Sequence, residues 1–479
     1  MVVSDATQRI TWLETQLAAK DAENEELREK LESALARIAE LEAKLNQNSS
    51  NSSRPPSSDP PWANKRKTKP RSKGKRKQGA QKGHPGHRRA LVPPEALRSS
   101  HDIHPEHCGS CGSTNLIDDG SEPLRHQVTD LPPIEPFTDE WRLHLGLCLD
   151  CGAATRAALP AGVPRSNFGP GIAAFVALLT AVYKVSKRGV QDRLASVFRV
   201  WMSLGAVSHC EREVAEALAT PIEEAREYVQ DQSIAHADET SWRERAKKMW
   251  LWVMATSYVS VFYILPGRTS ECAKKVLGRF KGILISDRFK AYLFYSMGHR
   301  QVCWAHLLRD FVALSEQGGI DGDLGQELVA LTEQMFTLWH RARDGPMSRS
   351  TFRRKMEPLR KQVEDVLEWG ADIGVQWRKF DDILKHREAL WTFVKVDGVE
   401  PTNNHAEKQV RHAVLLRKVS LGTQSVRGSV FIERMLTVVA TLRKQHRNAH
   451  EFLTEACRAR ITGSAAPSLL PDHAIDEAA

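Results

Sequence analysis

The sequence contains no long apolar run. Its most apolar stretch, residues 168–183, spans only about sixteen positions and includes glycine and proline, whereas a membrane-crossing helix needs roughly twenty apolar residues. The first residues are polar and helical in pattern, unlike a secretory signal. We therefore expect a cytoplasmic protein that makes no membrane contact.

Cysteine is scarce, with eight among 479 residues, and in a reducing cytoplasm these are not expected to form a disulfide framework. Four of them form two CxxC pairs, each followed by glycine: Cys108, Cys111, Cys148 and Cys151. Two thiolates on one tight turn supply half of a tetrahedral site, so the pairs predict structural Zn²⁺ in a zinc ribbon over residues 101–160. Redox-active pairs are the alternative. The other cysteines are expected in the core: Cys210, Cys272, Cys303 and Cys457.

Acidic residues are absent from Pro60 to Pro94, where twelve Lys or Arg residues gather in a chain of net charge +9. So many cations repel one another unless they are neutralised, and DNA phosphates do this with release of counterions. We expect contact with the backbone of double-stranded DNA and not base readout; the alternative is a solvated tail. The residues expected to bind DNA are Lys65, Arg66, Lys67, Lys69, Arg71, Lys73, Lys75, Arg76, Lys77 and Lys82.

A heptad pattern fills the N-terminal segment, residues 1–47. Apolar residues recur there on alternating steps of three and four, with a polar Asn24 at one core position. This pattern predicts a coiled coil and hence a homo-oligomer; the alternative is one amphipathic helix packed on its own chain. Residues 48–100 then read as a Ser/Pro linker followed by the basic arm. The heptad positions are Ile10, Leu13, Leu17, Leu27, Leu31, Ala34, Ile38, Leu41 and Leu45.

Residues 165–230 have apolar residues at helical spacing and predict a helical domain. Two short helices joined across a glycine within residues 189–216 resemble a helix-turn-helix. Such pairs are common in any helical domain, so the sequence leaves open whether this segment reads DNA.

A strand-rich block follows within residues 231–450. Apolar and β-branched runs at 249–257, 259–265 and 282–286, with a short helix at 271–280, predict buried strands. A first strand from Ser233 completes the order β-β-β-α-β, which begins a ribonuclease-H-like sheet. We expect an α/β multidomain protein with a helical insertion at about 316–395 and a C-terminal tail at 451–479.

Three acidic residues occupy distinctive positions in this block. Asp238 follows the first strand, Asp287 follows the fourth, and Glu407 starts a late helix. Carboxylates brought together at one sheet edge suit two Mg²⁺ (or Mn²⁺) ions acting on a phosphodiester. Taken singly, each has a bland alternative: the aspartates as strand terminators, and Glu407 in a capping box with Asn404.

Further residues would support this site. Asn403 and Arg411 lie one helical turn from Glu407 on either side. Asn403, Asn404 and Arg411 are therefore expected to orient the carboxylate or contact phosphate. Glu400 and Glu433 are weaker substitutes for Glu407.

These segments resemble the transposases of the insertion sequence sixty-six family, in particular their third-frame catalytic protein. The resemblance rests on the Asn/Ser/Pro segment 48–59, Gly79–His87, the CxxC pairs, His236–Thr240, Ser286–Tyr292 and Asn403–Arg411. It implies a bacterial DDE transposase with Asp238, Asp287 and Glu407 as its catalytic, metal-binding acids. It also implies DNA element ends and a DNA target as partners, and companion proteins of the same element.

The resemblance implies metal-dependent cleavage at the element ends and transfer of the 3′-hydroxyl into target DNA. Two other functions stay open: an inactive DNA-binding regulator, and a ribonuclease-H-like nuclease that cuts without joining. Cys303 and His306 resemble a CxxH motif found near the helical insertion in several DDE groups. A thiol and an imidazole packed at a strand-to-helix junction is the alternative, so their role stays open.

Overall fold

The computed structural model describes residues 2–45, 90–132 and 134–471. The predicted DNA-binding residues Lys65 to Lys82 lie outside these ranges, as does most of the linker. The chain divides into two compact units. One comprises residues 1–66, 141–192 and 201–479, and the other comprises residues 67–140 and 193–200.

The CxxC pairs form turns of the same kind. Cys108 receives the N–H of Gly112 on its carbonyl and donates its own N–H to Ser113, both at 2.8 Å. Cys148 makes the equivalent bonds at 2.9 Å, between β1 (Leu145–Leu147) and its antiparallel partner β2 (Ala154–Arg156). The two pairs belong to different units, so the Zn²⁺ site predicted across them stays a prediction.

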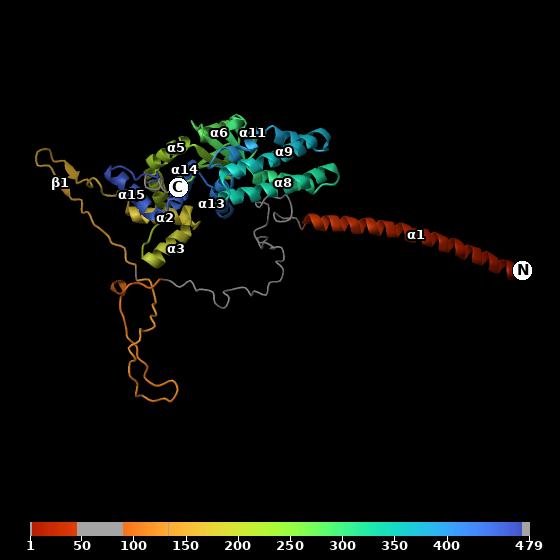
Figure 1. Cartoon of the computed structure of the whole chain (residues 1–479). Helices are drawn as coiled ribbons and strands as arrows, with labels where there is room; N and C mark the ends of the chain where they lie inside the picture. The colour runs from red at the N-terminus through yellow and green to blue at the C-terminus, as the bar shows by residue number, and fades with distance from the viewer. Residues whose placement is uncertain (1, 46–89, 133, 472–479) are drawn as a thin grey trace. The chain divides into compact units, whose positions relative to one another are not determined.

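The heptad segment forms the single helix α1 (Val2–Leu45), labelled in Figure 1. Four of its predicted core positions, Leu27, Leu31, Ile38 and Leu41, are 45–59% exposed. The expected helix is therefore present with an apolar face, and the coiled coil itself stays a prediction.

A helical layer precedes the strands. It consists of α2 (Pro170–Ala181), α3 (Lys187–Phe198), α4 (Leu204–Ala217) and α5 (Ala219–Gln230). Helices α3 and α4 coincide with the two helices expected in residues 189–216, and DNA reading by them stays a prediction.

The expected C-terminal tail is wrong over residues 451–471. Helix α15 (Ala449–Thr462) packs on α2 and α4, and residues after it are also held. Gln445 donates to the carbonyl of Leu469 at 2.8 Å, and Leu469 is fully buried. The physical reason is that Gln445 and Arg447 bind backbone carbonyls of this segment, contacts that no local sequence pattern reveals.

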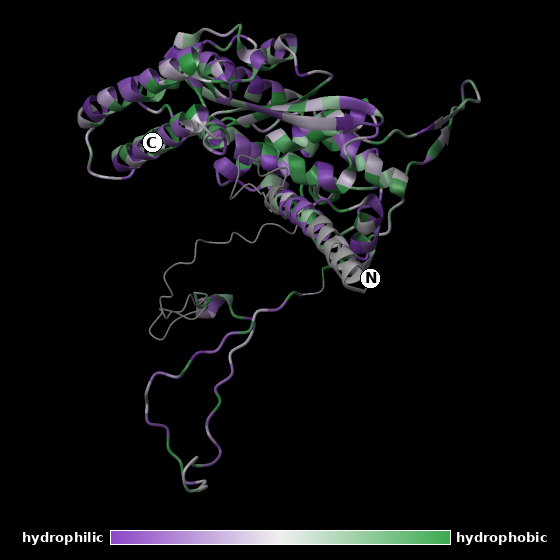
Figure 2. Ribbon diagram, turned by 90° about the vertical axis from the view of Figure 1, so that its right-hand side faces the viewer, coloured by the Kyte–Doolittle hydropathy of each residue, from purple (hydrophilic) through white to green (hydrophobic). Residues whose placement is uncertain are grey.

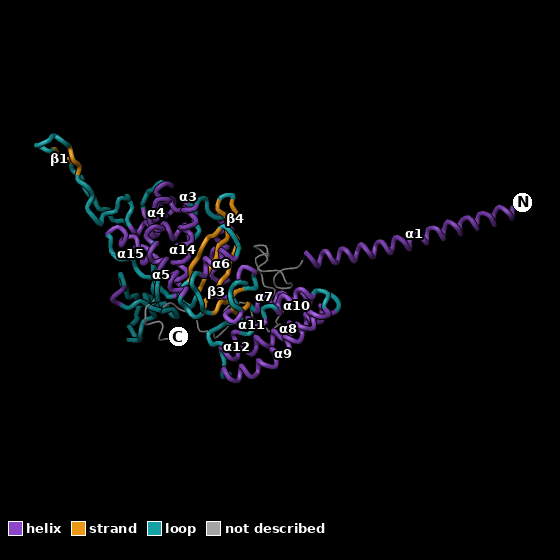
Figure 3. Tube along the Cα trace, turned by 90° about the horizontal axis from the view of Figure 1, so that it is seen from above, coloured by secondary structure: helices purple, strands orange, loops and turns teal. Residues whose placement is uncertain are grey.

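The central sheet has five strands in the order β5-β4-β3-β6-β7. Strands β3, β4 and β5 pair antiparallel, whereas β6 and β7 continue the sheet in parallel. In Figure 3, the helices that follow β7 lie on one side of these strands. Helices α4, α5, α14 (Val426–Lys444) and α15 lie on the other side. The strands are β3 (Ile234–Glu244), β4 (Lys247–Ala255), β5 (Ser260–Leu265), β6 (Ile283–Ser286) and β7 (Arg300–Val302).

Helix α6 (Ser270–Leu277) connects β5 to β6, and two late helices cover the sheet. Helix α13 (Asn404–Ser420) packs on β3 and β4, and α14 (Val426–Lys444) packs on β5. Thr437 and Thr441 of α14 accept the N–H groups of Phe262 and Ser260 at 3.0 and 3.1 Å. The outer edge of β5 is therefore bonded to helix side chains.

The expected helical insertion lies between β7 and α13 and has its own apolar core. In Figure 2 the helices carry both hydrophilic and hydrophobic residues, as helices with one buried face do. Among the described residues, no helix has the length and apolarity that crossing a membrane requires. The insertion comprises α7 (Trp304–Ser315), α8 (Ile320–Arg343), α9 (Arg349–Ile373), α10 (Trp377–Leu384), α11 (Arg387–Leu390) and α12 (Thr392–Lys395).

Candidate functional site

Asp238 and Asp287 come from adjacent parallel strands. The last registered pair of β3 and β6 is His236 with Ile285, and two further steps along each strand bring Asp238 opposite Asp287. Asp287 follows β6 as expected. Asp238, however, does not end its strand, because β3 continues to Glu244 in a hairpin with β4.

Glu407 lies in the first turn of α13. The capping-box alternative is wrong, because Asn403 and not Asn404 is the N-cap residue, and the cap makes no side-chain hydrogen bond. Glu407 instead turns toward α7, and its Oε1 atom is buried without a hydrogen-bond partner among the described residues. An uncompensated carboxylate oxygen of this kind is costly, so its position calls for a ligand.

The three acids interact electrostatically. Burial raises the pKa of Asp238 well above its usual value, and the negative charges of Glu239, Asp287 and Glu407 raise it further. Glu407, from a distant segment, therefore lies close enough to Asp238 for its charge to act there. A divalent cation is the natural partner for such a cluster because it neutralises several carboxylates at once.

Asn403 ties α13 to the strand that carries Asp238. Its Nδ2 donates to the carbonyl of Ala237 at 2.7 Å, and its Oδ1 lies 3.2 Å from Nδ1 of His236. Its backbone N–H points at Sγ of Cys303, 3.1 Å away. With its side chain buried and engaged, Asn403 is placed to orient Glu407 and not to touch phosphate. The other two supporting candidates, Asn404 and Arg411, are exposed.

Glu239 was missed as a functional candidate. Its carboxylate is held by Nε of Arg268 at 2.7 Å and by the hydroxyl of Tyr292 at 2.8 Å. Burial and the charge of Asp287 raise the pKa of Glu239 to about 7, against the opposing effect of Arg268. Glu239 lies in the motif His236–Thr240, and Tyr292 ends the motif Ser286–Tyr292. Their place in these motifs is the signal that could have identified them.

The loop that carries Asp287 is held by hydrogen bonds from β7 and by ion pairs with the helical insertion. Buried Arg300 donates to the carbonyl of Asp287 at 3.0 Å and to Oγ of Ser286 at 3.2 Å. Arg288 bridges Asp310 of α7 and Asp382 of α10. The position of Asp287 is therefore coupled to the helical insertion.

A second polar chain lies behind the site. The rings of His236 and His405 are 5.0 Å apart, and Nζ of Lys444 lies 2.8 Å from Nε2 of His405. Burial and the neighbouring basic groups lower the pKa of His236 to about 3 and of His405 to about 4. Burial lowers the pKa of Lys444 to about 7. These groups therefore add little positive charge behind the acids.

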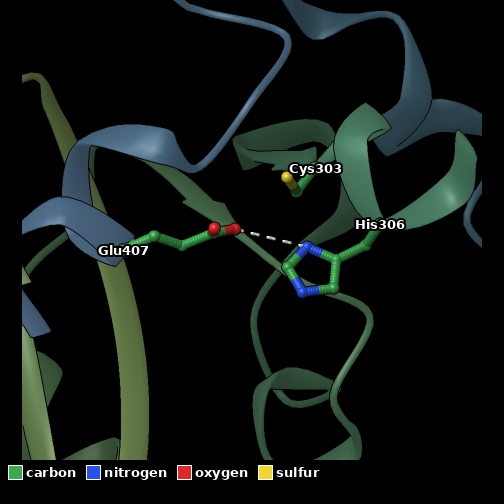
Figure 4. Close-up of side chains that lie close together, drawn as sticks. All are labelled: Cys303, His306 and Glu407. Carbon is green, nitrogen blue, oxygen red and sulfur yellow. Dashed lines mark ion pairs between the residues drawn. The ribbon is translucent and has the colours of Figure 1, made fainter. Parts of the chain in front are cut away.

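Cys303 and His306 meet Glu407 (Figure 4). Nδ1 of His306 lies 3.5 Å from Oε1 of Glu407. The three ligand atoms lie within 4.8 Å of one another, and they form the sole such group of His, Cys, Asp and Glu in the described part of the chain. Cys303 is buried, as expected of a core cysteine, but its sulfur also faces this group.

Glu433 is not a substitute for Glu407. Its carboxylate accepts the backbone N–H of Ile264 in β5, so it serves the sheet edge. Glu400 lies in the loop between α12 and α13 and is half-buried.

Comparison with known proteins finds two family models and two relatives that match this chain. A family model described as Transposase IS66 family matches residues 165–430, and a family of unknown function (DUF6444) matches residues 9–90. The uncharacterized protein y4qI of Sinorhizobium fredii (strain NBRC 101917 / NGR234) is 28% identical over 226 residues, 41% of this chain and 40% of that protein. The uncharacterized protein y4hP of the same strain is 22% identical over 384 residues, 71% of this chain and 68% of that protein.

The chain spans less than half the length of the first of these relatives. The family model, in contrast, covers more than half of the 479 residues here, including all three acids and the insertion. The chain belongs to the IS66 family of transposases.

Proposed function

We propose that this transposase cuts DNA at element ends and joins the exposed 3′-hydroxyl to target DNA, using Asp238, Asp287 and Glu407. The observation that carries the proposal is their convergence: Asp238 is half-buried, and its pKa is raised by desolvation and by the charges of both other acids. Perturbed carboxylate clusters of this kind gather at functional sites.

The sheet topology supports the ribonuclease-H-like part of the proposal. Three antiparallel strands followed by α6 and two parallel strands form the order expected from the sequence. On such a sheet the first and fourth strands are neighbours. This places Asp238 of β3 and Asp287 after β6 side by side, with the late helix α13 supplying Glu407.

The residues fit a divalent cation. Three mutually repelling carboxylates and one buried, unpartnered oxygen of Glu407 form the hard-oxygen donor set that Mg²⁺ or Mn²⁺ prefers. When bound, a metal pair activates the attacking oxygen and stabilises the leaving one.

The chain's own residues position the reaction. Asn403 holds Glu407 to β3, and Arg300 and Arg288 fix the loop of Asp287. In the first step a water oxygen attacks phosphorus, and the bond from phosphorus to the element's 3′-oxygen breaks. That oxygen keeps the electron pair and takes a proton. In the second step the resulting 3′-hydroxyl attacks a target phosphorus, and the target's own 3′-oxygen leaves.

The remaining segments would hold the DNA and pair the protomers. The basic arm, residues 65–82, would bind the DNA backbone. The Zn²⁺ ribbon of the CxxC pairs and the helices at 189–216 would contact the element ends. A coiled coil of α1 would bring two ends together, and companion proteins of the same element would join this assembly.

The test uses purified full-length protein and a labelled duplex carrying an element end, with Mg²⁺ or Mn²⁺ and target DNA. We expect nicking at the end and a joined product, both abolished by Asp287→Asn. The matched control Asp372→Asn changes an exposed aspartate on α9 and should retain both products.

Other outcomes select another function. Nicking without a joined product identifies a nuclease that cuts without joining. Binding without any nicking identifies a DNA-binding regulator and contradicts the catalytic proposal.

A further inference from the structure

Cys303, His306 and Glu407 form a cluster that the cleavage chemistry does not use as a whole. Cys303 is the N-cap residue of α7, and His306 lies in the first turn of that helix. A spacing of three places both side chains on one side of the helix start. Glu407 reaches the same point from the first turn of α13. Figure 4 shows its carboxylate pointing at the imidazole, with the sulfur near both.

Two atoms of this cluster lack a partner. Nδ1 of His306 and Oε1 of Glu407 are both buried, 3.5 Å apart, and neither makes a hydrogen bond within the described structure. An imidazole nitrogen that carries no proton offers a lone pair to a cation. Leaving buried polar atoms without hydrogen-bond partners is energetically costly. A cation that takes both atoms as ligands removes this cost.

The donor set distinguishes between cations. Nitrogen, sulfur and oxygen ligands suit Zn²⁺ and related transition metals, whereas Mg²⁺ prefers oxygen. Zn²⁺ bonds of about 2.0–2.3 Å separate neighbouring tetrahedral ligands by roughly 3.3–3.8 Å. The distance of 3.5 Å between His306 and Glu407 fits this range. The sulfur, within 4.8 Å of both atoms, needs a small side-chain movement to complete three ligands.

Cys303 would bind a cation as the thiolate, and Zn²⁺ displaces the thiol proton when it binds. The N–H of Asn403 points at the sulfur from 3.1 Å and would stabilise the thiolate that forms. Three protein ligands leave a fourth position open.

We propose that Cys303, His306 and Glu407 bind a divalent cation of the Zn²⁺ class, and that this cation inhibits DNA cleavage by withdrawing Glu407 from Asp238 and Asp287. The binding half stands on the cluster alone, whereas the inhibitory half rests on the proposed function. A cation that binds Oε1 beside His306 would leave Glu407 only its second oxygen for a metal shared with Asp238 and Asp287.

In the binding test, the full-length protein is titrated with Co²⁺. The absorption of bound Co²⁺ reports ligation by a thiolate. We expect a charge-transfer band that is lost in Cys303→Ser and lost or shifted in His306→Asn. The matched control Cys272→Ser changes a half-buried cysteine on α6 and should retain the band. A band that is unchanged in both Cys303→Ser and His306→Asn comes from the CxxC pairs and overturns the proposed site.

The activity test adds Zn²⁺ to nicking reactions that contain Mg²⁺, and each variant is compared with its own rate without Zn²⁺. We expect Cys303→Ser and His306→Asn to need at least about tenfold more Zn²⁺ for half inhibition, in line with the 10–100-fold effects of altered metal environments. Equal inhibition of wild type and both variants overturns the inhibitory half. If wild type does not nick at all, the cleavage proposal fails, and the Co²⁺ result still decides the site.

Discussion

Asn403 donates from Nδ2 to the carbonyl oxygen of Ala237 at 2.7 Å. This bond joins the residue just before α13 to the residue just before Asp238, so the segments that carry two of the three acids share one buried amide. The same side chain also meets His236. Asn403 therefore helps to fix the relative position of Glu407 and Asp238.

Asn403→Ala should weaken both the fold and the chemistry. The change leaves the Ala237 carbonyl and Nδ1 of His236 without their partner, at about 1–3 kcal/mol for a buried group. We expect a lower denaturant midpoint and slower nicking, measured on the same preparation. Asn404→Ala is the matched control, since Asn404 is exposed; equal effects of the two substitutions would refute this role.

Removing one carboxylate should relieve repulsion. Burial and three acidic neighbours raise the pKa of Asp238 in the folded protein. The folded protein therefore loses stability as the pH rises from the pKa of Asp238 in the unfolded chain toward its higher pKa in the folded one. In metal-free buffer at pH 7, Asp238→Asn should therefore melt at a higher temperature than wild type. Mg²⁺ or Mn²⁺ should raise the melting temperature of wild type and raise that of the variant much less. An equal rise in both would contradict metal binding at Asp238.

Lys444 should impose a pH dependence of the opposite sign. Burial lowers its pKa from 10.5 to about 7, so between these values the unfolded chain binds more protons than the folded one. Stability then rises with pH across this window, by up to about 1.4 kcal/mol per pH unit. Urea unfolding of wild type and Lys444→Met at pH 7, 8 and 9 isolates this slope, with exposed Lys418→Met as control. Parallel curves for wild type and Lys444→Met would show that Lys444 is not the source.

The apolar face of α1 should hold protomers together. Leu31 and Ile38 are 59% and 51% exposed and occupy heptad core positions, where charge is strongly unfavourable in a coiled coil. Light scattering should find Leu31→Lys/Ile38→Lys shifted toward monomer at concentrations where wild type is oligomeric. Glu32→Gln, on the outer face, should leave the mass unchanged. A monomeric wild type would rule out the coiled coil.

The strands were predictable because their apolar runs are continuous. The sequence placed β4, β5 and β6 within a few residues of their bounds, since buried strands need apolar residues on both faces. It ended β3 too early, because the second half, from Thr240 to Glu244, is polar. That half is held by pairing with β4 and by a bridge from Glu244 to Thr423, a contact across the chain that no local pattern contains.

The acids were found from order and spacing, and their surroundings were not. The positions of Asp287 and Glu407 follow from the elements that carry them. The partners of Glu239 are Arg268 and Tyr292, from different loops, and only the folded chain brings them together. The capping-box alternative for Glu407 was wrong for the same reason: local spacing permits it, but Asn403 is drawn to β3 and starts the helix one residue early.

The helix α14 closes one edge of the sheet with its own side chains, through Thr437, Thr441 and Glu433. An open edge strand is a template onto which another chain can add a strand and begin aggregation. Because the outward N–H groups of β5 are already bonded, this edge of the sheet is protected against the addition of a strand from another copy. Any association between copies must therefore use other surfaces than the β5 edge.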